Sequence, residues 1–401
     1  MSNADLPAVP AGFRLAGVHC GIKQDPDKED LLLIICDGDA VASGVYTQNV
    51  VHSAAVATNR QKTPGAGFRA VVANSGNANT CTGQRGWEDT LEMAKCAAAA
   101  CGALPEQTLV MSTGVIGAYL PMGCVVSGIA AANERLGDDR EALLSAARAM
   151  LTTDKFQKIA GRTIDFADSH VQVTGMAKGA GMIAPNMATM LAVILTDAAL
   201  SPQQAQRVLS DAVEVSFNCI SVDGHMSTSD TVLLLASGDM DKRPLSDEDL
   251  ASLAVAVSEV CVELAKMIPD DGEGASHRII IDVKGCATRV DAHRIAKTIA
   301  ESPLVKTGIA GADPNWGRIV SAAGYAGVRF DPNQLSLQIN GTPVYQQGVP
   351  VEFNAAQLSV SIRDHRDTSL VLTLAEGDAR IRFWTSDLTL EYVRFNSEYT
   401  T

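Results

Sequence analysis

The sequence has few of the features expected of a membrane, secreted or nucleic-acid-binding protein. No apolar run reaches the roughly 18 residues that a membrane-spanning helix needs. Residues 1–24 contain acidic residues and prolines instead of a basic segment followed by an apolar one, which argues against a secretory signal peptide. Lys and Arg total 32 against 46 Asp and Glu, and the net charge of −14 disfavours contact with a phosphate backbone. We therefore expect a cytoplasmic protein with no membrane or nucleic-acid partner.

Paired cysteines and aromatic residues are also scarce. The nine cysteines are scattered and include no Cys-x-x-Cys pair, which argues against a disulfide framework and against a zinc site. Aromatic residues make up 4% of the chain, beside 33 glycines. This composition indicates a core of Ala, Val, Ile and Leu with many tight turns, as layered α/β proteins have.

The sequence does contain an alternation of strand-like and helix-like segments. Apolar runs at Leu31–Cys36 and Phe68–Ala73 each lead into a turn and predict buried strands. Ser201 is followed by a proline and, three residues on, by Gln204. This is the pattern of a capped helix start, so it predicts a helix over about 202–216.

The alternation restarts near residue 285, and we expect two domains, residues 1–284 and 285–401. No connecting segment is rich enough in Pro or Ser to act as a free tether, so the domains should pack together. In the second domain, apolar runs predict strands at 334–339, 358–362 and 370–374.

The segment Gly179–Ala184 admits a nucleotide-binding interpretation. Its glycines match the Gly-x-Gly-x-x-Gly/Ala pattern, and the apolar run after it ends at an acid, Asp197. The helix that should follow would contain Pro185 and be only a few residues long, whereas a Rossmann unit needs a crossover helix of about ten residues or more. Nucleotide binding is therefore the weaker alternative.

Thr189 suggests a different chemistry for the same stretch, because it stands at the start of a buried apolar strand after a glycine-rich segment and a turn. A threonine hydroxyl needs a base to become a nucleophile, and the seven scattered histidines suggest no Ser/His/Asp set. Self-cleavage between Ala188 and Thr189 would free the α-amine of Thr189 to act as that base. On these residues alone, a threonine that merely begins a strand is the simpler alternative.

The stretch Met176–Leu191 resembles the signature of the ornithine acetyltransferase (glutamate N-acetyltransferase) family of arginine biosynthesis. The likeness is collinear along almost the whole chain, which makes it specific, and it favours Thr189 as a nucleophile. Further motifs that match the family in order are Asn74–Asn79, Ser112–Gly117, Asp271–Ala275, Asp313–Ile319 and Tyr392–Asn396.

The resemblance implies a fold and a processing step. We expect an α/β protein with an αββα-type sandwich, of the kind found in autoprocessed aminopeptidases and ornithine acetyltransferases. A smaller C-terminal α+β domain would close the active site with its tail. Cleavage between Ala188 and Thr189 would give an alpha chain, 1–188, and a beta chain, 189–401, with two copies of each in a heterotetramer.

The resemblance also implies an activity. Thr189 would take the acetyl group from N-acetylornithine, release ornithine and pass the acetyl group to glutamate, and some family members also accept acetyl-CoA as donor. Thr113 and Gly114 fall on the oxyanion-hole positions of the family. A Thr-Gly turn can indeed direct a hydroxyl and a backbone N–H at a developing oxyanion. This chemistry needs no metal or organic cofactor.

Both substrates are amino acids with charged ends, so the pocket must neutralise carboxylate and ammonium groups. Lys178 and Glu273 would supply one charge of each sign for this purpose. On the residues alone, a solvated loop lysine and a solvated turn acid are the simpler alternatives. By resemblance, the positions that contact substrate are Thr152, Lys178, Thr189, Glu273, Asn396 and the terminal Thr401.

Some positions leave alternatives open. Thr153 is nearly as good a candidate as Thr152 for the substrate contact. His225 stands where the family has an acid, and Ser276-His277 stands where Thr-Lys is usual. We interpret these as neutral surface substitutions, although His277 beside Glu273 could add pH dependence. The competing function is an autoprocessed amidase or aminopeptidase, which would give the acyl group to water.

Overall fold

The computed structural model describes residues 6–166, 170–184, 190–238 and 245–398. Its first sheet has the strand order β4-β3-β2-β9-β7-β6-β5, with β1 paired to β2. The strands are β1 (Phe13–Val18), β2 (Leu31–Tyr46), β3 (Gly65–Asn77), β4 (Thr108–Val115), β5 (Lys158–Asp165), β6 (His170–Lys178), β7 (Leu191–Thr196) and β9 (Thr231–Ala236). The helices of this part are α1 (Ala54–Lys62), α2 (Gly83–Ala100), α3 (Met122–Asn133), α4 (Arg140–Met150), α5 (Pro202–Val215) and α6 (Asp247–Asp270).

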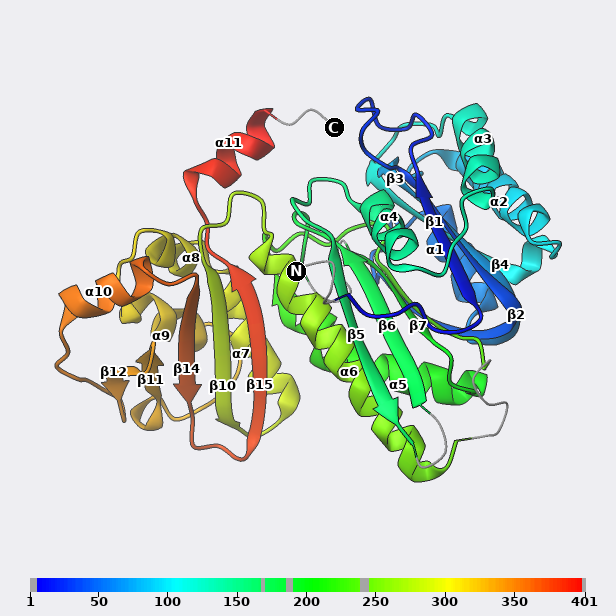
Figure 1. Cartoon of the computed structure of the whole chain (residues 1–401). Helices are drawn as coiled ribbons and strands as arrows, with labels where there is room; N and C mark the ends of the chain where they lie inside the picture. The colour runs from blue at the N-terminus through cyan, green and yellow to red at the C-terminus, as the bar shows by residue number, and fades with distance from the viewer. Residues whose placement is uncertain (1–5, 167–169, 185–189, 239–244, 399–401) are drawn as a thin grey trace.

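This sheet folds over itself into a sandwich, because the long strand β2 belongs to both of its halves. The first part of β2 pairs with β3, and after a register shift its last residues pair with β9. One apolar cluster joins inward residues of β2, β3 and β4 to those of β6, β7 and β9, with α4 packed at its side. The helices α2 and α3 lie over the outer face of one half, and α5 and α6 lie over the other (Figure 1). Their buried side chains join the apolar cluster of the face that each pair covers. The layers are therefore helix, sheet, sheet, helix, which confirms the expected α/β sandwich.

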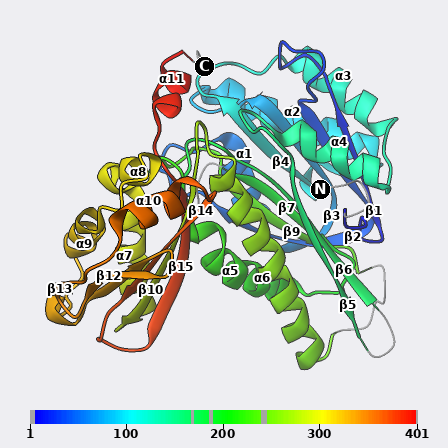
Figure 2. The same ribbon diagram turned by 60° about the vertical axis from the view of Figure 1, so that its left-hand side comes forward.

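The second sheet has the strand order β13-β12-β11-β14-β10-β15-β8 and lies beside the sandwich (Figure 2). Its strands are β8 (Ile220–Ser221), β10 (Arg278–Cys286), β11 (Ser336–Ile339), β12 (Thr342–Gln346), β13 (Val349–Pro350), β14 (Asp367–Thr373) and β15 (Ala379–Ser386). The accompanying helices are α7 (Arg289–Glu301), α8 (Pro303–Ala310), α9 (Trp316–Gly324), α10 (Ala355–Arg363) and α11 (Leu390–Glu398).

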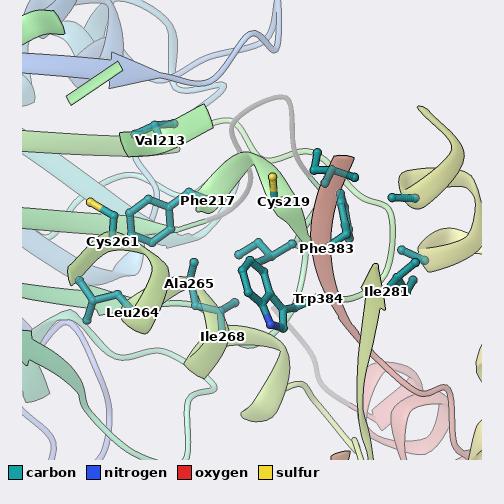
Figure 3. Close-up of a cluster of buried hydrophobic side chains, with 14 of the residues drawn as sticks. Val213, Phe217, Cys219, Cys261, Leu264, Ala265, Ile268, Ile281, Phe383 and Trp384 are labelled. Atoms are coloured by element: carbon teal, nitrogen blue, oxygen red, sulfur yellow. The ribbon is translucent and has the colours of Figure 1, made fainter. Parts of the chain in front are cut away.

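One apolar core runs from the sandwich into the second sheet (Figure 3). Cys261 and Leu264 of α6 belong to the same cluster as Ile281 of β10 and Phe383 of β15. The two parts are thus packed together over buried surface. The expected division after residue 284 falls inside β10, which belongs wholly to the second sheet. That division remains a prediction about folding units.

Local signals explain most of the elements. The Ser201 hydroxyl caps α5 by accepting a hydrogen bond from the Gln204 amide, and the Ser201 amide donates to Oε1 of Gln204, as the capping box predicts. The predicted strand at 358–362 is wrong, because these residues lie in α10. Asn354 caps that helix, and Leu358 and Ile362 are buried four residues apart, which is helical spacing.

Candidate active site

One wall of the site is the end of β4. β3 and β4 run parallel and pair Ser75 with Thr113 and Gly76 with Gly114, which fixes the Thr-Gly turn against β3. Gly114 has a φ of +132°, and a Cβ there would lie 2.2 Å from the carbonyl carbon of Gly76. Only glycine fits this position. The Thr113 side chain is buried beside it.

Replacing Gly114 with alanine should destabilise the protein by at least about 3 kcal/mol, because strained backbone and a backbone clash add together. The matched control is Gly117→Ala, since Gly117 has a φ of +84° but nothing within 4 Å of its Cβ position. That variant should lose only about 1–2 kcal/mol. Chemical denaturation of both variants measures the difference, and equal losses would contradict the clash.

A cavity of about 130 Å³ gathers residues from distant parts of the chain. It lies where β4, the end of β6, the loop after α4, the loop after α6 and the C-terminal helix α11 meet. Predicted site residues among those that line it are Thr113, Gly114, Thr152, Lys178, Glu273 and Asn396. Ala188, Thr189 and Thr401 lie outside the described residues, so their predicted roles stay predictions.

Lys178 is the last residue of β6 and is 2% exposed. Its Nζ lies 4.0 Å from Oδ2 of Asp154, whose side chain is fully buried. Burial lowers the pKa of Lys178, and the negative charge of Asp154 opposes this effect. Although burial alone would raise the pKa of Asp154, the ammonium groups of Lys158 and Lys178 hold it well below its usual range.

Glu273 reaches the cavity from the loop after α6. Its Oε1 accepts a hydrogen bond from the Thr153 hydroxyl at 2.7 Å, and its Oε2 accepts one from the Asn396 amide at 3.0 Å. The carboxylate lies against Gly181, where a Cβ would come within 2.4 Å of it. Glu273 is thus held by a residue before β5 and a residue of α11, and it faces the same cavity as Lys178. Both Thr152 and Thr153 line that cavity.

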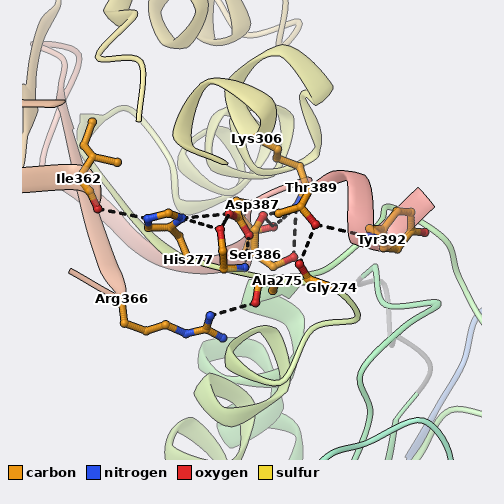
Figure 4. A network of polar contacts seen from close by, with 12 residues as sticks. Gly274, Ala275, His277, Lys306, Ile362, Arg366, Ser386, Asp387, Thr389 and Tyr392 are labelled. Atoms are coloured by element: carbon orange, nitrogen blue, oxygen red, sulfur yellow. Dashed lines mark hydrogen bonds and ion pairs between the residues drawn. The ribbon is translucent and has the colours of Figure 1, made fainter. Parts of the chain in front are cut away.

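Hydrogen bonds join the C-terminal segment, at Asp387 and Thr389, to the loop that carries Glu273 (Figure 4). The Thr389 hydroxyl donates to the carbonyl of Gly274 at 2.7 Å, and the Tyr392 amide donates to the Thr389 hydroxyl at 3.3 Å. The Ser276 amide donates to Oδ1 of Asp387 at 2.9 Å. These bonds bring α11 to the cavity, which Asn396 of this helix lines. That the tail closes the active site stays a prediction.

His277 is part of this network and is buried, at 7% exposed. Its Nδ1 lies 3.0 Å from Oδ2 of Asp387, and its Nε2 lies 3.1 Å from the carbonyl oxygen of Ile362. The interpretation of His277 as a surface substitution is therefore wrong. Ser276 and His225 are exposed, in agreement with that interpretation.

Residues 179–184, which precede the expected cleavage site, are bound through their backbone by one carboxylate. No residue of 179–184 is helical and β7 begins at Leu191, so fewer residues lie between the two than a crossover helix needs, which argues against the nucleotide-binding interpretation. The Asp223 carboxylate accepts the amides of Met182 and Ile183 at 2.6 and 2.8 Å. Asp223 therefore fixes the backbone of this segment at Met182 and Ile183.

The segment after the expected cleavage site is held as firmly. The amide of Met190 donates to Oδ1 of Asp230 at 3.0 Å, and its carbonyl accepts from the Thr231 amide at 3.1 Å. Asp230 is fully buried, and burial raises its pKa well above the usual range.

The sequence interpretation missed a set of buried charges behind the cavity. Lys158 Nζ lies 2.7 Å from Oδ1 of Asp154 and 2.6 Å from Oδ2 of Asp271, and all three side chains are 0% exposed. The four-residue spacing of Asp154 and Lys158 was a weak signal for this pair. Asp271 stands two residues before Glu273, inside a motif chosen for its family likeness.

Neither a metal cluster nor a membrane span is found in the part of the chain that the structure describes. No group of three or more His, Cys, Asp and Glu side chains there is placed to hold a metal ion. None of the helices described is both long and apolar enough to cross a membrane.

A family model and several known proteins match this chain along nearly its whole length. The sequence model of the ArgJ family matches residues 14–401. The arginine biosynthesis bifunctional protein ArgJ of Rhodopirellula baltica is 46% identical over 396 residues, which cover 98% of this chain and 96% of that protein. The protein of the same name from Geobacter sulfurreducens is 42% identical, with 97% and 99% covered. A solved chain of ornithine acetyltransferase from Mycobacterium tuberculosis, complexed with ornithine, is 38% identical with a TM-score of 0.43, and the match covers 46% of this chain and 96% of that one. The family resemblance is thereby confirmed: this chain belongs to the ArgJ family.

Proposed function

We propose that this protein transfers an acetyl group from N2-acetyl-L-ornithine to L-glutamate in arginine biosynthesis, through an acetyl ester of Thr189. The observation that carries the proposal is the cavity that gathers Thr113, Gly114, Lys178 and Glu273. It combines a turn able to stabilise an oxyanion with one buried positive and one negative group, as two amino-acid substrates require. Family membership supports the same reaction.

The first step is self-cleavage. The Thr189 hydroxyl attacks the Ala188 carbonyl carbon, the amide C–N bond breaks, and the Thr189 nitrogen takes up a proton. Water then hydrolyses the resulting ester, which leaves the Ala188 carboxylate and a free Thr189 amine. The products are chains 1–188 and 189–401, which we propose assemble as two of each in the cytoplasm.

Acetyl transfer follows in two half-reactions. The Thr189 amine takes the hydroxyl proton as Oγ attacks the acetyl carbonyl, and the hydroxyl of Thr113 and the amide of Gly114 stabilise the oxyanion. The C–N bond breaks, and ornithine leaves with the proton. The glutamate amine then attacks the acetyl ester, N-acetylglutamate forms, and Thr189 Oγ recovers its proton. An acetyl thioester such as acetyl-CoA could load the same hydroxyl.

The test is to incubate the purified protein with N-acetylornithine, with and without glutamate, and to quantify N-acetylglutamate and acetate. The proposal expects acetyl transfer to glutamate and little acetate. Acetate release without transfer would instead establish the amidase or aminopeptidase alternative. Adding acetyl-CoA in place of N-acetylornithine tests the second donor.

Glu273→Gln should raise the KM for the amino-acid substrates about tenfold or more, because it removes a charge-assisted hydrogen bond to an ammonium group. The amide keeps the size of the side chain and a partner for Asn396. The control is Glu259→Gln, which removes an exposed carboxylate that pairs with Arg162 on the surface. An unchanged KM in Glu273→Gln would show that Glu273 does not face the substrate ammonium.

A further inference from the structure

The cavity lysine belongs to a buried row of alternating charges. Lys178, Asp154, Lys158 and Asp271 follow one another, with N–O distances of 4.0, 2.7 and 2.6 Å between successive members. Of the four, Lys178 lines the cavity. Asp154 stands directly behind it, with a side chain that is 0% exposed.

Asp154 accepts hydrogen bonds from the backbone of two segments that line the cavity. Its Oδ1 accepts the amide of Gly179 at 2.6 Å, which is the residue after Lys178. Its Oδ2 accepts the amide of Thr152 at 3.0 Å, and Thr152 also lines the cavity. One carboxylate therefore ties together two segments that carry predicted substrate contacts.

The charge of Lys178 depends on its neighbours because burial favours the neutral amine. Among the acids near Lys178, Asp154 does most to offset the effect of burial and to favour the ammonium form. The charged and titratable groups that act on Lys178 are Asp154, Glu273 and Asp230, which favour its charged form, and Lys158 and Lys23, which disfavour it.

We propose that Asp154 is a positioning residue, which fixes Lys178 in the cavity and keeps its ammonium group charged for a substrate carboxylate. That Lys178 binds a substrate carboxylate rests on the proposed function. The effect of Asp154 on the charge of Lys178 does not.

The charge is tested by carbamylation of the protein with cyanate at a series of pH values. The neutral amine adds to the carbon of cyanic acid, so the extent of reaction at Lys178, normalised to the exposed Lys95, reports its titration. Asp154→Asn should lower the midpoint for Lys178 by about 1 pH unit or more. Asp271→Asn is the matched control, because it removes the other carboxylate from Lys158 without approaching Lys178, and it should lower the midpoint by less than half as much. Equal midpoints in Asp154→Asn and wild type would overturn the proposal.

The functional effect is tested through the KM for glutamate across pH 6–9. Asp154→Asn should raise this KM about tenfold, and the rise should begin at lower pH than in wild type. Asp271→Asn should shift the pH profile by less than half as much. If Asp154→Asn does not fold, Asp154→Glu takes its place, because it keeps the negative charge and should keep the wild-type midpoint at Lys178. A lowered midpoint in Asp154→Glu would contradict the proposal. A wild-type protein that transfers no acetyl group would refute the proposed function and leave the carbamylation result standing.

Discussion

Replacing Thr189 with alanine is expected to leave one uncut chain of 42.1 kDa and to lower acetyl transfer at least about 1,000-fold. The variant lacks both the attacking hydroxyl and, because no cleavage occurs, the free α-amine that activates it. Intact mass under denaturing conditions checks the first effect, and an assay of N-acetylglutamate checks the second. The wild type should give two fragments, 1–188 and 189–401.

Two further variants make this result specific. Thr189→Ser keeps a hydroxyl and should still be cleaved, more slowly. Thr298→Ala removes an exposed hydroxyl on α7 that donates to the Arg294 carbonyl of the same helix, and this variant should be cleaved and active like the wild type. An uncut wild-type chain, or a cleaved and active Thr189→Ala variant, would contradict the mechanism.

Lys158→Met should be the most destabilising single substitution in the buried row of charges, at about 3–5 kcal/mol. Lys158 neutralises two carboxylates that are 0% exposed, and its removal leaves both in a water-excluded place. Folding stability is best measured in the uncut Thr189→Ala background, where a single chain unfolds.

The control for this loss is Lys95→Met, which breaks an exposed ion pair with Glu92. Surface pairs of this kind contribute about 0–1 kcal/mol, so the control should change little. A loss below about 1 kcal/mol in Lys158→Met would mean that Asp154 and Asp271 take up protons at little cost. The double variant Lys158→Met, Asp271→Asn should recover part of the stability, because it removes the carboxylate that has lost its ammonium partner, whereas Asp154 still has Lys178.

Features that depend on residues close together in the sequence could be predicted. The capping box at Ser201 predicts the start of α5, and the collinear motifs identify several residues that share one cavity. The strand predicted at 358–362 fails because a short apolar run does not distinguish a buried strand from one buried face of a helix. The cap at Asn354 decides the outcome in favour of α10.

Burial of charge could not be predicted, because it arises from segments that are distant in sequence. Asp154 and Asp271 meet at Lys158 although 117 positions separate the two acids along the chain. His277 likewise resembles a surface residue until β15 brings Asp387 beside it. Such pairs are determined by tertiary packing, and no period or local motif in one sequence reports them.

The strand order of the first sheet has a consequence for the cleavage that we propose between Ala188 and Thr189. β7 and β9 lie next to each other between β2 and β6, although the outer two precede residue 188 and the inner two follow it. Each fragment is therefore interleaved with the other, and separation would break the backbone hydrogen bonds along two strand boundaries. Once cut, the protein can refold only when two different molecules meet, so recovery after unfolding depends on concentration. If the protein is cleaved as proposed, dilute fragments that unfold should rarely reassemble, and the lifetime of the enzyme should then be set by how slowly it unfolds.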